Sequence, residues 1–238
     1  MNLEIKNLSK NYKKKEAVKN VDVTLSPGIC GLLGANGAGK TTLMRMMSGI
    51  LEPSEGTVLY CGKDIRNNIQ YRSEFGFLPQ EIQFSKDFTV IDYLEYIAAL
   101  KNIPMDVTKK RIDNLLSILT LEDVRKKKIV KLSGGMKRRV GIAQAMINDP
   151  KVLILDEPTA GLDPGERINF RNFLVVTSKE RIVVLSTHIV SDIEDIANYV
   201  MIMKDGELNR VVSKEEYDDL EKLYKSIFVN EEVRYETV

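Results

Sequence analysis

The stretch Gly34-Ala-Asn-Gly-Ala-Gly-Lys-Thr41 decides the fold, because it fits the pattern G-x-x-x-x-G-K-[ST] of a phosphate-binding loop. An apolar run at 28–33 precedes it and a helix-like run at 41–47 follows it. This order of strand, loop and helix is the context in which such a loop works. The glycines let backbone N–H groups approach phosphate oxygens, and the following helix adds the positive end of its dipole. The sequence therefore predicts a nucleoside triphosphate site in an α/β protein.

Two side chains of this loop are candidates for direct contact with the triphosphate and its metal ion. Lys40 is expected to reach the β- and γ-phosphates, and the Thr41 hydroxyl is expected to bind Mg²⁺. The candidate nucleotide-binding residues of this segment are Gly34, Asn36, Gly37, Ala38, Gly39, Lys40, Thr41 and Thr42.

Size and composition favour a soluble, intracellular protein with one large domain or two small ones. The chain has 238 residues, 43% hydrophobic and 29% charged, with a formal net charge of +1. So small a net charge gives no electrostatic case for a nucleic-acid partner. No apolar run approaches the roughly 20 residues of a membrane span, and the opening residues alternate like a strand rather than a secretory signal. Cys30 and Cys61 lie in strand-like segments and are expected to be buried, reduced thiols.

Strands and helices alternate along the chain in a way that favours a mostly parallel sheet. Strand-like segments at 3–8, 17–25 and 57–60 predict a β-rich beginning. Helical spacing follows at 89–120, where Thr89 and Asp92 predict a capping box and Pro104 ends the first of two helices, the second at 106–119. The apolar runs 152–155 and 182–185 are typical of parallel strands buried on both faces. A hairpin is expected at 205–206, and a last amphipathic helix is expected to start at Ser213.

Two carboxylates, Asp156 and Glu157, follow the apolar run 152–155. Ligands of open α/β sheets bind at the carboxyl ends of the strands, so both side chains are expected beside the phosphate loop. Asp156 is suited to holding Mg²⁺ through water, and Glu157 to polarising a water for attack on the γ-phosphate.

His188, the single histidine, follows the other apolar run and is expected at the same edge of the sheet. There it could hydrogen-bond the γ-phosphate and help to hold the attacking water. Gln80 follows the strand-like stretch 75–78 and could contact either Mg²⁺ or water.

A second glycine-rich segment, Leu132-Ser-Gly-Gly-Met136, precedes a predicted helix at 137–147, with Ser133 as its N-cap. Free N–H groups, a hydroxyl and a helix dipole would suit another phosphate. Because the first loop already supplies a full cradle, this second site suggests a phosphate that is held by a partner molecule.

Taken together, these residues make the chain resemble the nucleotide-binding subunit of an ABC transporter from about residue 3 to residue 212. The phosphate loop is at 34–41, Gln80 matches the Q-loop, and Leu132-Ser-Gly-Gly135 matches the signature. Residues 152–157 match the strand of the metal and the base, Ala160-Gly-Leu-Asp163 matches the D-loop, and His188 matches the switch histidine. Tyr12 stands where the family has an aromatic residue that stacks on adenine.

The resemblance implies a P-loop NTPase core with a mostly parallel sheet, an N-terminal antiparallel β subdomain and an inserted helical subdomain at about 80–148. Residues 1–212 would form one ATPase domain, and 213–238 a short acidic amphipathic helix and tail. ATP and Mg²⁺ would be the ligands. The implied catalytic residues are Glu157, His188, Lys40 and Gln80; the implied metal-binding residues are Thr41, Gln80 and Asp156; further implied nucleotide contacts are Ser133, Gly134, Gly135 and Asp163.

The family also implies partners. Two subunits, either two copies or a copy and a paralogue, would pack head to tail, with ATP between one phosphate loop and the other subunit's Ser133 and Gly135. Integral membrane permease subunits would meet residues 80–120, which places the chain in the cytoplasm on the inner face of the cell membrane. The wording of the phosphate loop and of 132–139 is similar to exporter ATPases of the ABC-2 type for drugs, antibiotic peptides or polysaccharides. Met136 departs from the usual Gln, so a side-chain amide contact is absent.

Two other functions fit parts of the same pattern. A soluble ABC ATPase of the iron–sulfur assembly or cell-division type would keep the ATP chemistry without a permease. A nucleotide-sensing module with negligible turnover would have lost Glu157 or His188, and both are present.

Overall fold

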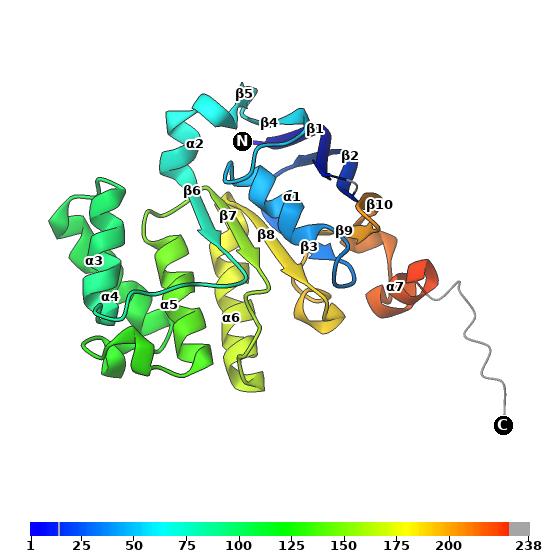
Figure 1. The fold of residues 1–238 in the computed structure, drawn as a ribbon. Helices are drawn as coiled ribbons and strands as arrows, with labels where there is room; N and C mark the ends of the chain where they lie inside the picture. Colours follow the sequence, from blue (N-terminus) through cyan, green and yellow to red (C-terminus); the bar gives the residue numbers. More distant parts are fainter. Residues whose placement is uncertain (14, 229–238) are drawn as a thin grey trace.

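The strand that precedes the phosphate loop, β3 (Gly28–Leu33), is buried along its whole length inside a six-stranded sheet. The computed structural model describes residues 1–13 and 15–228 (Figure 1). The strand order is β10-β9-β3-β8-β7-β6, and the pairs from β9 to β6 are parallel while β10 is antiparallel to β9. The other strands of this sheet are β6 (Phe75–Leu78), β7 (Val152–Asp156), β8 (Ile182–Thr187), β9 (Tyr199–Lys204) and β10 (Glu207–Ser213).

A second, antiparallel sheet in the order β2-β1-β4-β5 comes mostly from the start of the chain. Its strands are β1 (Leu3–Tyr12), β2 (Lys15–Leu25), β4 (Glu55–Tyr60) and β5 (Lys63–Asp64). The helix after the phosphate loop, α1 (Lys40–Met47), contributes four buried side chains to the apolar core that it shares with both sheets. This arrangement is an α/β fold with a mostly parallel sheet and an antiparallel β subdomain, and it confirms the predicted fold class.

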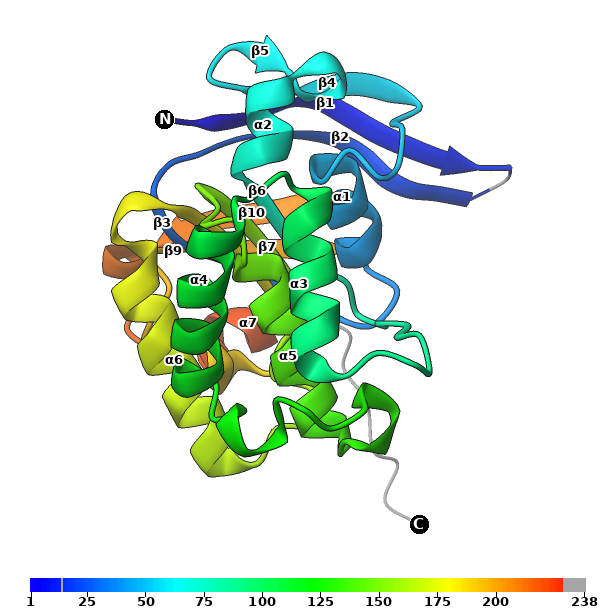
Figure 2. The same cartoon turned by 90° about the vertical axis from the view of Figure 1, so that its left-hand side faces the viewer.

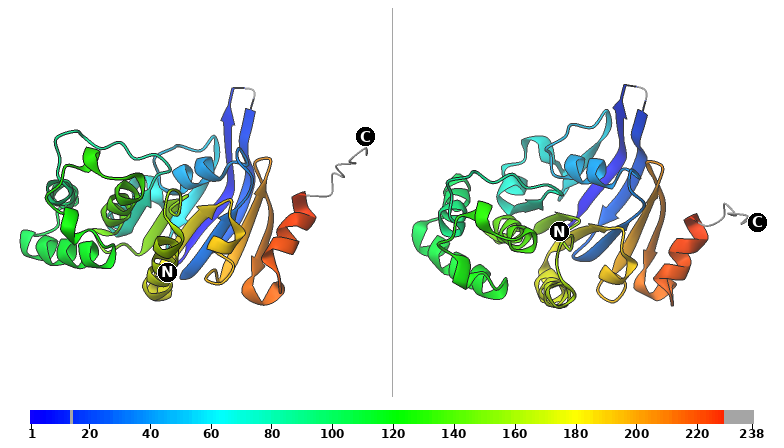
Figure 3. Two further views of the ribbon diagram at one scale, coloured as in Figure 1. Left: turned by 90° about the horizontal axis from the view of Figure 1, so that it is seen from below. Right: turned by 60° about the horizontal axis from the view of Figure 1, so that its bottom comes forward.

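The central strands alternate between two apolar cores, which explains why they are apolar on both faces. Val152, Ile154 and Val184 lie in the core with α1, whereas Leu153 and Leu155 lie in the core beneath the other helices. The remaining helices are α2 (Ile69–Glu74), α3 (Val90–Leu100), α4 (Met105–Ile118), α5 (Gly134–Met146), α6 (Pro164–Thr177) and α7 (Leu220–Phe228). Helices α3, α4 and α5 form a group on one side (Figure 2), and α7 lies on the opposite side of the molecule (Figure 3).

The structure follows several local predictions. Thr89 and Asp92 form both hydrogen bonds of the capping box, and Pro104 directly precedes α4. The hairpin between β9 and β10 turns at Asp205 and Gly206. None of the helices within 1–13 and 15–228 combines the length and the apolar character needed to cross a bilayer.

Three local expectations are wrong. Cys61 is exposed in the turn between β4 and β5, where its φ is 50°, although Cys30 is buried. Helix α5 begins at Gly134 rather than at 137, so both signature glycines lie inside it. Ser213 starts only a 3₁₀ turn that ends at the extended residue Tyr217, and α7 begins at Leu220. The last part of the expected acidic tail, 229–238, lies outside the described residues.

Candidate functional site

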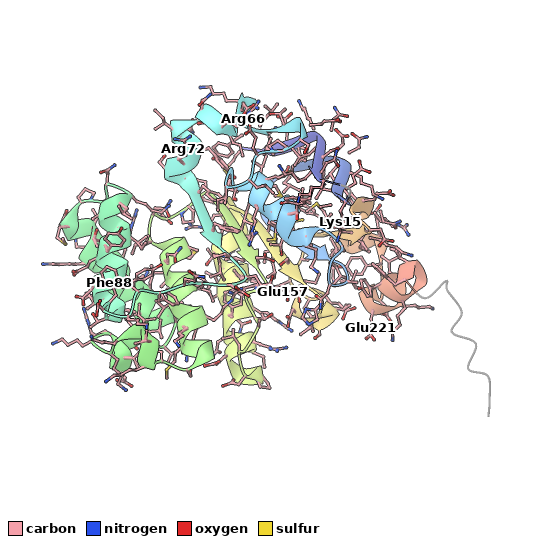
Figure 4. All side chains as sticks on the ribbon, viewed as in Figure 1. Lys15, Arg66, Arg72, Phe88, Glu157 and Glu221 are labelled. Carbon is pink, nitrogen blue, oxygen red and sulfur yellow. The ribbon has the colours of Figure 1, made fainter. Side chains whose placement is uncertain are left out.

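A pocket of about 330 Å³ opens between the phosphate loop, the start of β2 and the carboxyl ends of the central strands. Glu157 stands beyond β7 and Lys15 on β2 (Figure 4). The residues that line the pocket are Lys15, Ala17, Asn36, Gly37, Gly39, Lys40, Thr41, Thr42, Gln80 and Glu157. Six of the eight predicted loop residues therefore share one pocket with Gln80 and Glu157, at the edge of the sheet where ligands bind, whereas Gly34 and Ala38 do not line it.

Close backbone contacts fix the shape of the phosphate loop. Gly39 has a φ of 103°, and a Cβ there would lie 2.4 Å from the Ala17 carbonyl oxygen. A Cβ on Gly34 would lie 2.5 Å from the carbonyl oxygen of Met203. Ala38 is buried and does not line the pocket, but its carbonyl accepts the Gly206 N–H at 3.1 Å. Only glycine fits at 34 and 39, because these contacts leave no room for a side chain.

Lys40 provides one positive charge of the pocket, which Lys15 also lines. Its Nζ donates to the carbonyls of Gly34 and Ala35 at 2.7 and 3.1 Å. Burial lowers the pKa of Lys40, and the negative charges of Glu157 and Asp156 oppose that shift. A cation held at the phosphate loop is well placed to bind phosphate oxygens together with backbone N–H groups.

Asp156 has one carboxylate oxygen that is available to a metal ion. Ser186 donates its hydroxyl to Asp156 Oδ1 at 2.6 Å, whereas Oδ2 is buried and has no hydrogen-bond partner within 1–13 and 15–228. A buried carboxylate oxygen left unpaired carries a large cost unless a cation or water meets it. Together with the Thr41 hydroxyl in the adjacent pocket, this oxygen offers the hard ligands that Mg²⁺ prefers.

Glu157 lines the pocket and pairs with His188, which is not among the lining residues. The Nδ1 of His188 lies 3.0 and 3.1 Å from the two carboxylate oxygens of Glu157. Glu157 itself is buried, whereas the His188 side chain is half exposed. Glu157 has a left-handed φ of 50°, and its N–H donates to Ser186 Oγ at 2.9 Å. Such strain at a non-glycine residue often marks a functional position.

Arg138 links Gln80 to the strand that carries the two carboxylates. One guanidinium nitrogen donates to the carbonyls of Pro79 and Gln80, both at 2.8 Å, and the other donates to the Asp156 carbonyl. Burial lowers the pKa of Arg138 to about 10, against the charges of Asp156 and Glu157. This places the Gln80 backbone at a fixed position beside the pocket.

The signature residues lie elsewhere. Ser133 is exposed and caps α5 by accepting the Met136 N–H at 3.2 Å, and a Cβ on Gly134 would meet no atom within 4 Å. None of residues 132–135 lines the pocket. Asp163 is also outside it and caps α6 in a capping box with Glu166.

Tyr12 lies at the end of β1, opposite the pocket residue Lys15 in the strand register. Its ring is half exposed, with the Lys10 ammonium 5.6 Å from the ring centroid. An exposed aromatic ring next to the pocket is available for stacking on a base.

Four residues of the site were not identified from the sequence: Ser186, Arg138, Lys15 and Ala17. Ser186 directly follows the apolar run 182–185, and a hydroxyl in that position is a signal that a polar partner exists near the buried strand. Arg138 is in a polar stretch that resembles an exposed helix face, and Lys15 is part of a basic run that resembles a solvated turn.

Comparisons with known proteins show which sequences and folds this chain is similar to. A family model described as ABC transporter matches residues 18–160. The uncharacterized ABC transporter ATP-binding protein YxlF of Bacillus subtilis (strain 168) is 38% identical over 208 residues, which are 87% of this chain and 69% of that protein. The Nod factor export ATP-binding protein I of Cupriavidus metallidurans is 37% identical over 207 residues, which are 86% and 68%.

One solved protein, the bacterial ABC transporter cassette MJ0796, is similar in two structures. Its dimeric structure superposes with a TM-score of 0.83 at 25% identity, over 89% of this chain and 98% of that chain. Its dimeric post-hydrolysis state, bound to ADP and Pi, superposes over the same shares with a TM-score of 0.79 at 25% identity.

Proposed function

The chain belongs to the ABC transporter family of ATP-binding proteins, and from this membership we propose that it is a Mg²⁺-dependent ATPase subunit that powers a separate membrane permease. The observation that carries the proposal is the pairing of Glu157 with His188 beside the phosphate loop. A base at this position can take the proton of a water that attacks the γ-phosphate.

The roles of the side chains follow from their positions. The loop N–H groups and Lys40 bind the phosphates, and Thr41 together with Asp156, through water, holds Mg²⁺. When bound there, Mg²⁺ would supply positive charge that offsets the negative charge of the phosphates. Glu157 accepts a proton as the oxygen of water bonds to the γ-phosphorus and the bond to the β-phosphate oxygen breaks, which releases ADP and phosphate. His188 orients Glu157 and hydrogen-bonds the γ-phosphate.

We place the ATP sites at a head-to-tail dimer interface. The exposed Ser133 and the adjacent open Gly134 lie outside the chain's own pocket, so a second subunit is needed for them to reach ATP. The similar cassette MJ0796 is dimeric, which supports this arrangement.

An apolar groove of about 470 Å³ is the surface that we assign to the permease, and of its lining residues only Lys101 lies in the segment 80–120 that the family resemblance implied. It is lined by Arg45, Ile50, Phe75, Gly76, Phe77, Pro79, Lys101, Gln144 and Ala145. Ile50, at 64% exposure, leaves an apolar side chain in this groove that a bound segment could cover. Pro79 directly precedes Gln80, so movement of a bound permease segment can reach the ATP pocket. The exporter name of one relative and the signature wording support export as the direction.

The Glu157→Gln variant tests the chemistry. It should bind ATP, accumulate as a closed dimer and lose turnover at least about 100-fold, the contribution of a general base. Glu180→Gln, at a carboxylate with one 3.8 Å contact to Lys151, is the control and should hydrolyse ATP normally. Undiminished hydrolysis by Glu157→Gln overturns the role of Glu157. Mg²⁺ removal with a chelator should likewise abolish turnover of the unmodified chain.

Mixed dimers test the shared site. A Lys40→Ala subunit mixed with a Ser133→Ala subunit leaves one site with both halves intact and should occlude ATP, although neither variant does so alone. Absence of occlusion in the mixture contradicts the head-to-tail arrangement.

Co-purification with an integral membrane protein tests the groove. Ile50→Glu should lose the membrane partner, whereas Ile69→Glu, an exposed isoleucine of α2 outside the groove, should keep it. Equal retention by both variants contradicts the assignment of the groove, and full ATPase activity with no membrane partner at all favours the soluble type of ABC ATPase.

A further inference from the structure

Helix α5 packs directly against the segment 75–82, which consists of β6 and the residues after it and includes Gln80. A Cβ on Gly76 would lie 2.0 Å from the Ala145 carbonyl oxygen, so β6 touches the helix backbone. A Cβ on Gly141 would lie 2.0 Å from Ile82 Cδ1 and 2.8 Å from Leu78 Cδ1. Because these contacts leave no free space between the two elements, they are expected to move together.

Arg138 adds a polar connection at the same interface. It lies one turn before Gly141 and donates to the carbonyls of Pro79, Gln80 and Asp156. The side chain is 7% exposed, and its Nε has no hydrogen-bond partner among the described residues. A buried guanidinium that loses these carbonyls has no water to replace them, so separating α5 from Gln80 is costly.

The first turn of the same helix carries the signature residues. Ser133 is its N-cap, and Gly135 packs closely enough on Gly161 that a Cβ would lie 3.1 Å from the Gly161 carbonyl oxygen. Helix α5 therefore connects Ser133 and Gly135, which we assign to a neighbour's ATP, with Gln80, which lines the chain's own pocket.

We propose that Arg138 is a positioning residue that couples the two ATP sites of the dimer, because it makes Gln80 and Asp156 follow α5 when Ser133 and Gly135 engage the neighbour's ATP. This inference rests on the proposed function. The coupling is carried by the three carbonyl contacts of one side chain and by the close packing at Gly76 and Gly141. Occupation of one site thereby sets the geometry of the other.

Hydrogen–deuterium exchange of a peptide spanning 76–84 measures this coupling. In the Glu157→Gln background, ATP-driven dimer formation, followed by light scattering, should slow exchange of this peptide about tenfold, a typical coupling between sites. In Glu157→Gln with Arg138→Met, the dimer should still form, but exchange should slow less than about twofold. Arg138→Lys keeps the positive charge but can donate to fewer carbonyls, so the slowing of exchange should lie between the values of the other two proteins.

Arg181→Met is the matched control. Arg181 also donates to two backbone carbonyls, those of Pro150 and Thr177, and to the Asp149 carboxylate. It directly precedes β8, at the opposite end of that strand from the pocket. This variant should retain the tenfold slowing. Full slowing in Arg138→Met, or in Arg138→Lys if the methionine variant does not fold, overturns the coupling while leaving the dimer intact. Failure of Glu157→Gln to dimerise with ATP overturns the proposed function itself, and the coupling with it.

A kinetic measurement separates positioning from a loss of structure. Arg138→Met should lower kcat several-fold with little change in the binding of a fluorescent ATP analogue by the isolated subunit, since the phosphate loop is untouched. Equal losses in analogue binding and in kcat contradict a positioning role.

Discussion

The hydroxyl of Ser186 donates to Asp156 Oδ1 at 2.6 Å and accepts the N–H of Glu157 at 2.9 Å, so one buried side chain fixes both carboxylate residues. The bond to Oδ1 leaves Oδ2 as the oxygen of Asp156 that is available for Mg²⁺.

Ser186→Ala should therefore weaken metal binding and stability together. The loss of a hydrogen bond to a buried carboxylate costs about 2 kcal/mol of unfolding free energy. The Mg²⁺ concentration for half-maximal ATP hydrolysis should rise about tenfold, because Asp156 loses the hydrogen bond that holds its carboxylate in place. Ser178→Ala, which removes another buried serine whose hydroxyl bonds the Val175 carbonyl, is the control. A Ser186→Ala variant with unaltered Mg²⁺ dependence would show that Asp156 needs no such support.

Gly76→Ala should destabilise the fold through its contact with α5. The added methyl would lie 2.0 Å from a backbone oxygen, which cannot move without shifting the helix. Overpacking of this kind costs about 3 kcal/mol, measurable in urea-induced unfolding. Gly165→Ala is the comparison, because its nearest contact would be an ordinary 3.4 Å and alanine favours the helix. Equal stability of the two variants contradicts the close packing of β6 on α5.

The phosphate loop, the central strands and the positions of Glu157 and His188 were predictable because each is encoded locally. A glycine-rich loop between an apolar strand and a helix, or a polar residue directly after a buried strand, needs no knowledge of distant contacts. The fold class follows from the same alternation of apolar runs.

The roles of Ser186 and Arg138 were not predictable because they depend on tertiary contacts. Arg138 bonds carbonyls 58 and 59 positions earlier in the sequence, which no local pattern records. Cys61 shows the converse error, since a residue that continues an apolar strand pattern stands in the turn after that strand. The capping pattern at Ser213 is real, but the extended backbone at Tyr217 stops the helix after one turn.

Stability should fall in acid partly because of Asp64. Three groups donate hydrogen bonds to this carboxylate: the Arg66 guanidinium, the Arg66 backbone N–H and the Thr57 hydroxyl. These bonds hold the pKa of Asp64 well below its ordinary value of 3.8. As the pH falls, Asp64 is protonated at a higher pH in the unfolded chain than in the folded protein. The stabilisation by this carboxylate is therefore complete above about pH 4 and is lost as the pH falls below it. The partly exposed pair limits the effect to about 1 kcal/mol or less.

Thermal unfolding between pH 6 and pH 3 checks this expectation. Asp64→Asn should have a lower Tm at pH 6 and a smaller fall in Tm below pH 4 than the unmodified chain. Asp87→Asn removes a fully solvated carboxylate with a single 3.7 Å contact to Lys128 and serves as the control. Parallel Tm curves for Asp64→Asn and the unmodified chain would rule out this contribution.

Met136→Gln should lower the stability of the folded chain and strengthen the ATP-bound dimer. The Met136 side chain is half buried against the larger apolar core, while its N–H bonds to Ser133, so the substitution removes apolar contact and leaves the cap in place. The loss is about 1 kcal/mol, or a fall of about 3 °C in Tm for the nucleotide-free chain. The new amide beside Ser133 should lower the ATP concentration for half-maximal dimerisation of Glu157→Gln several-fold. Met105→Gln, at an exposed methionine of α4, should change neither quantity. If Met136→Gln dimerises at the same ATP concentration as its parent, the residue after the signature glycines does not contribute to closure in this chain.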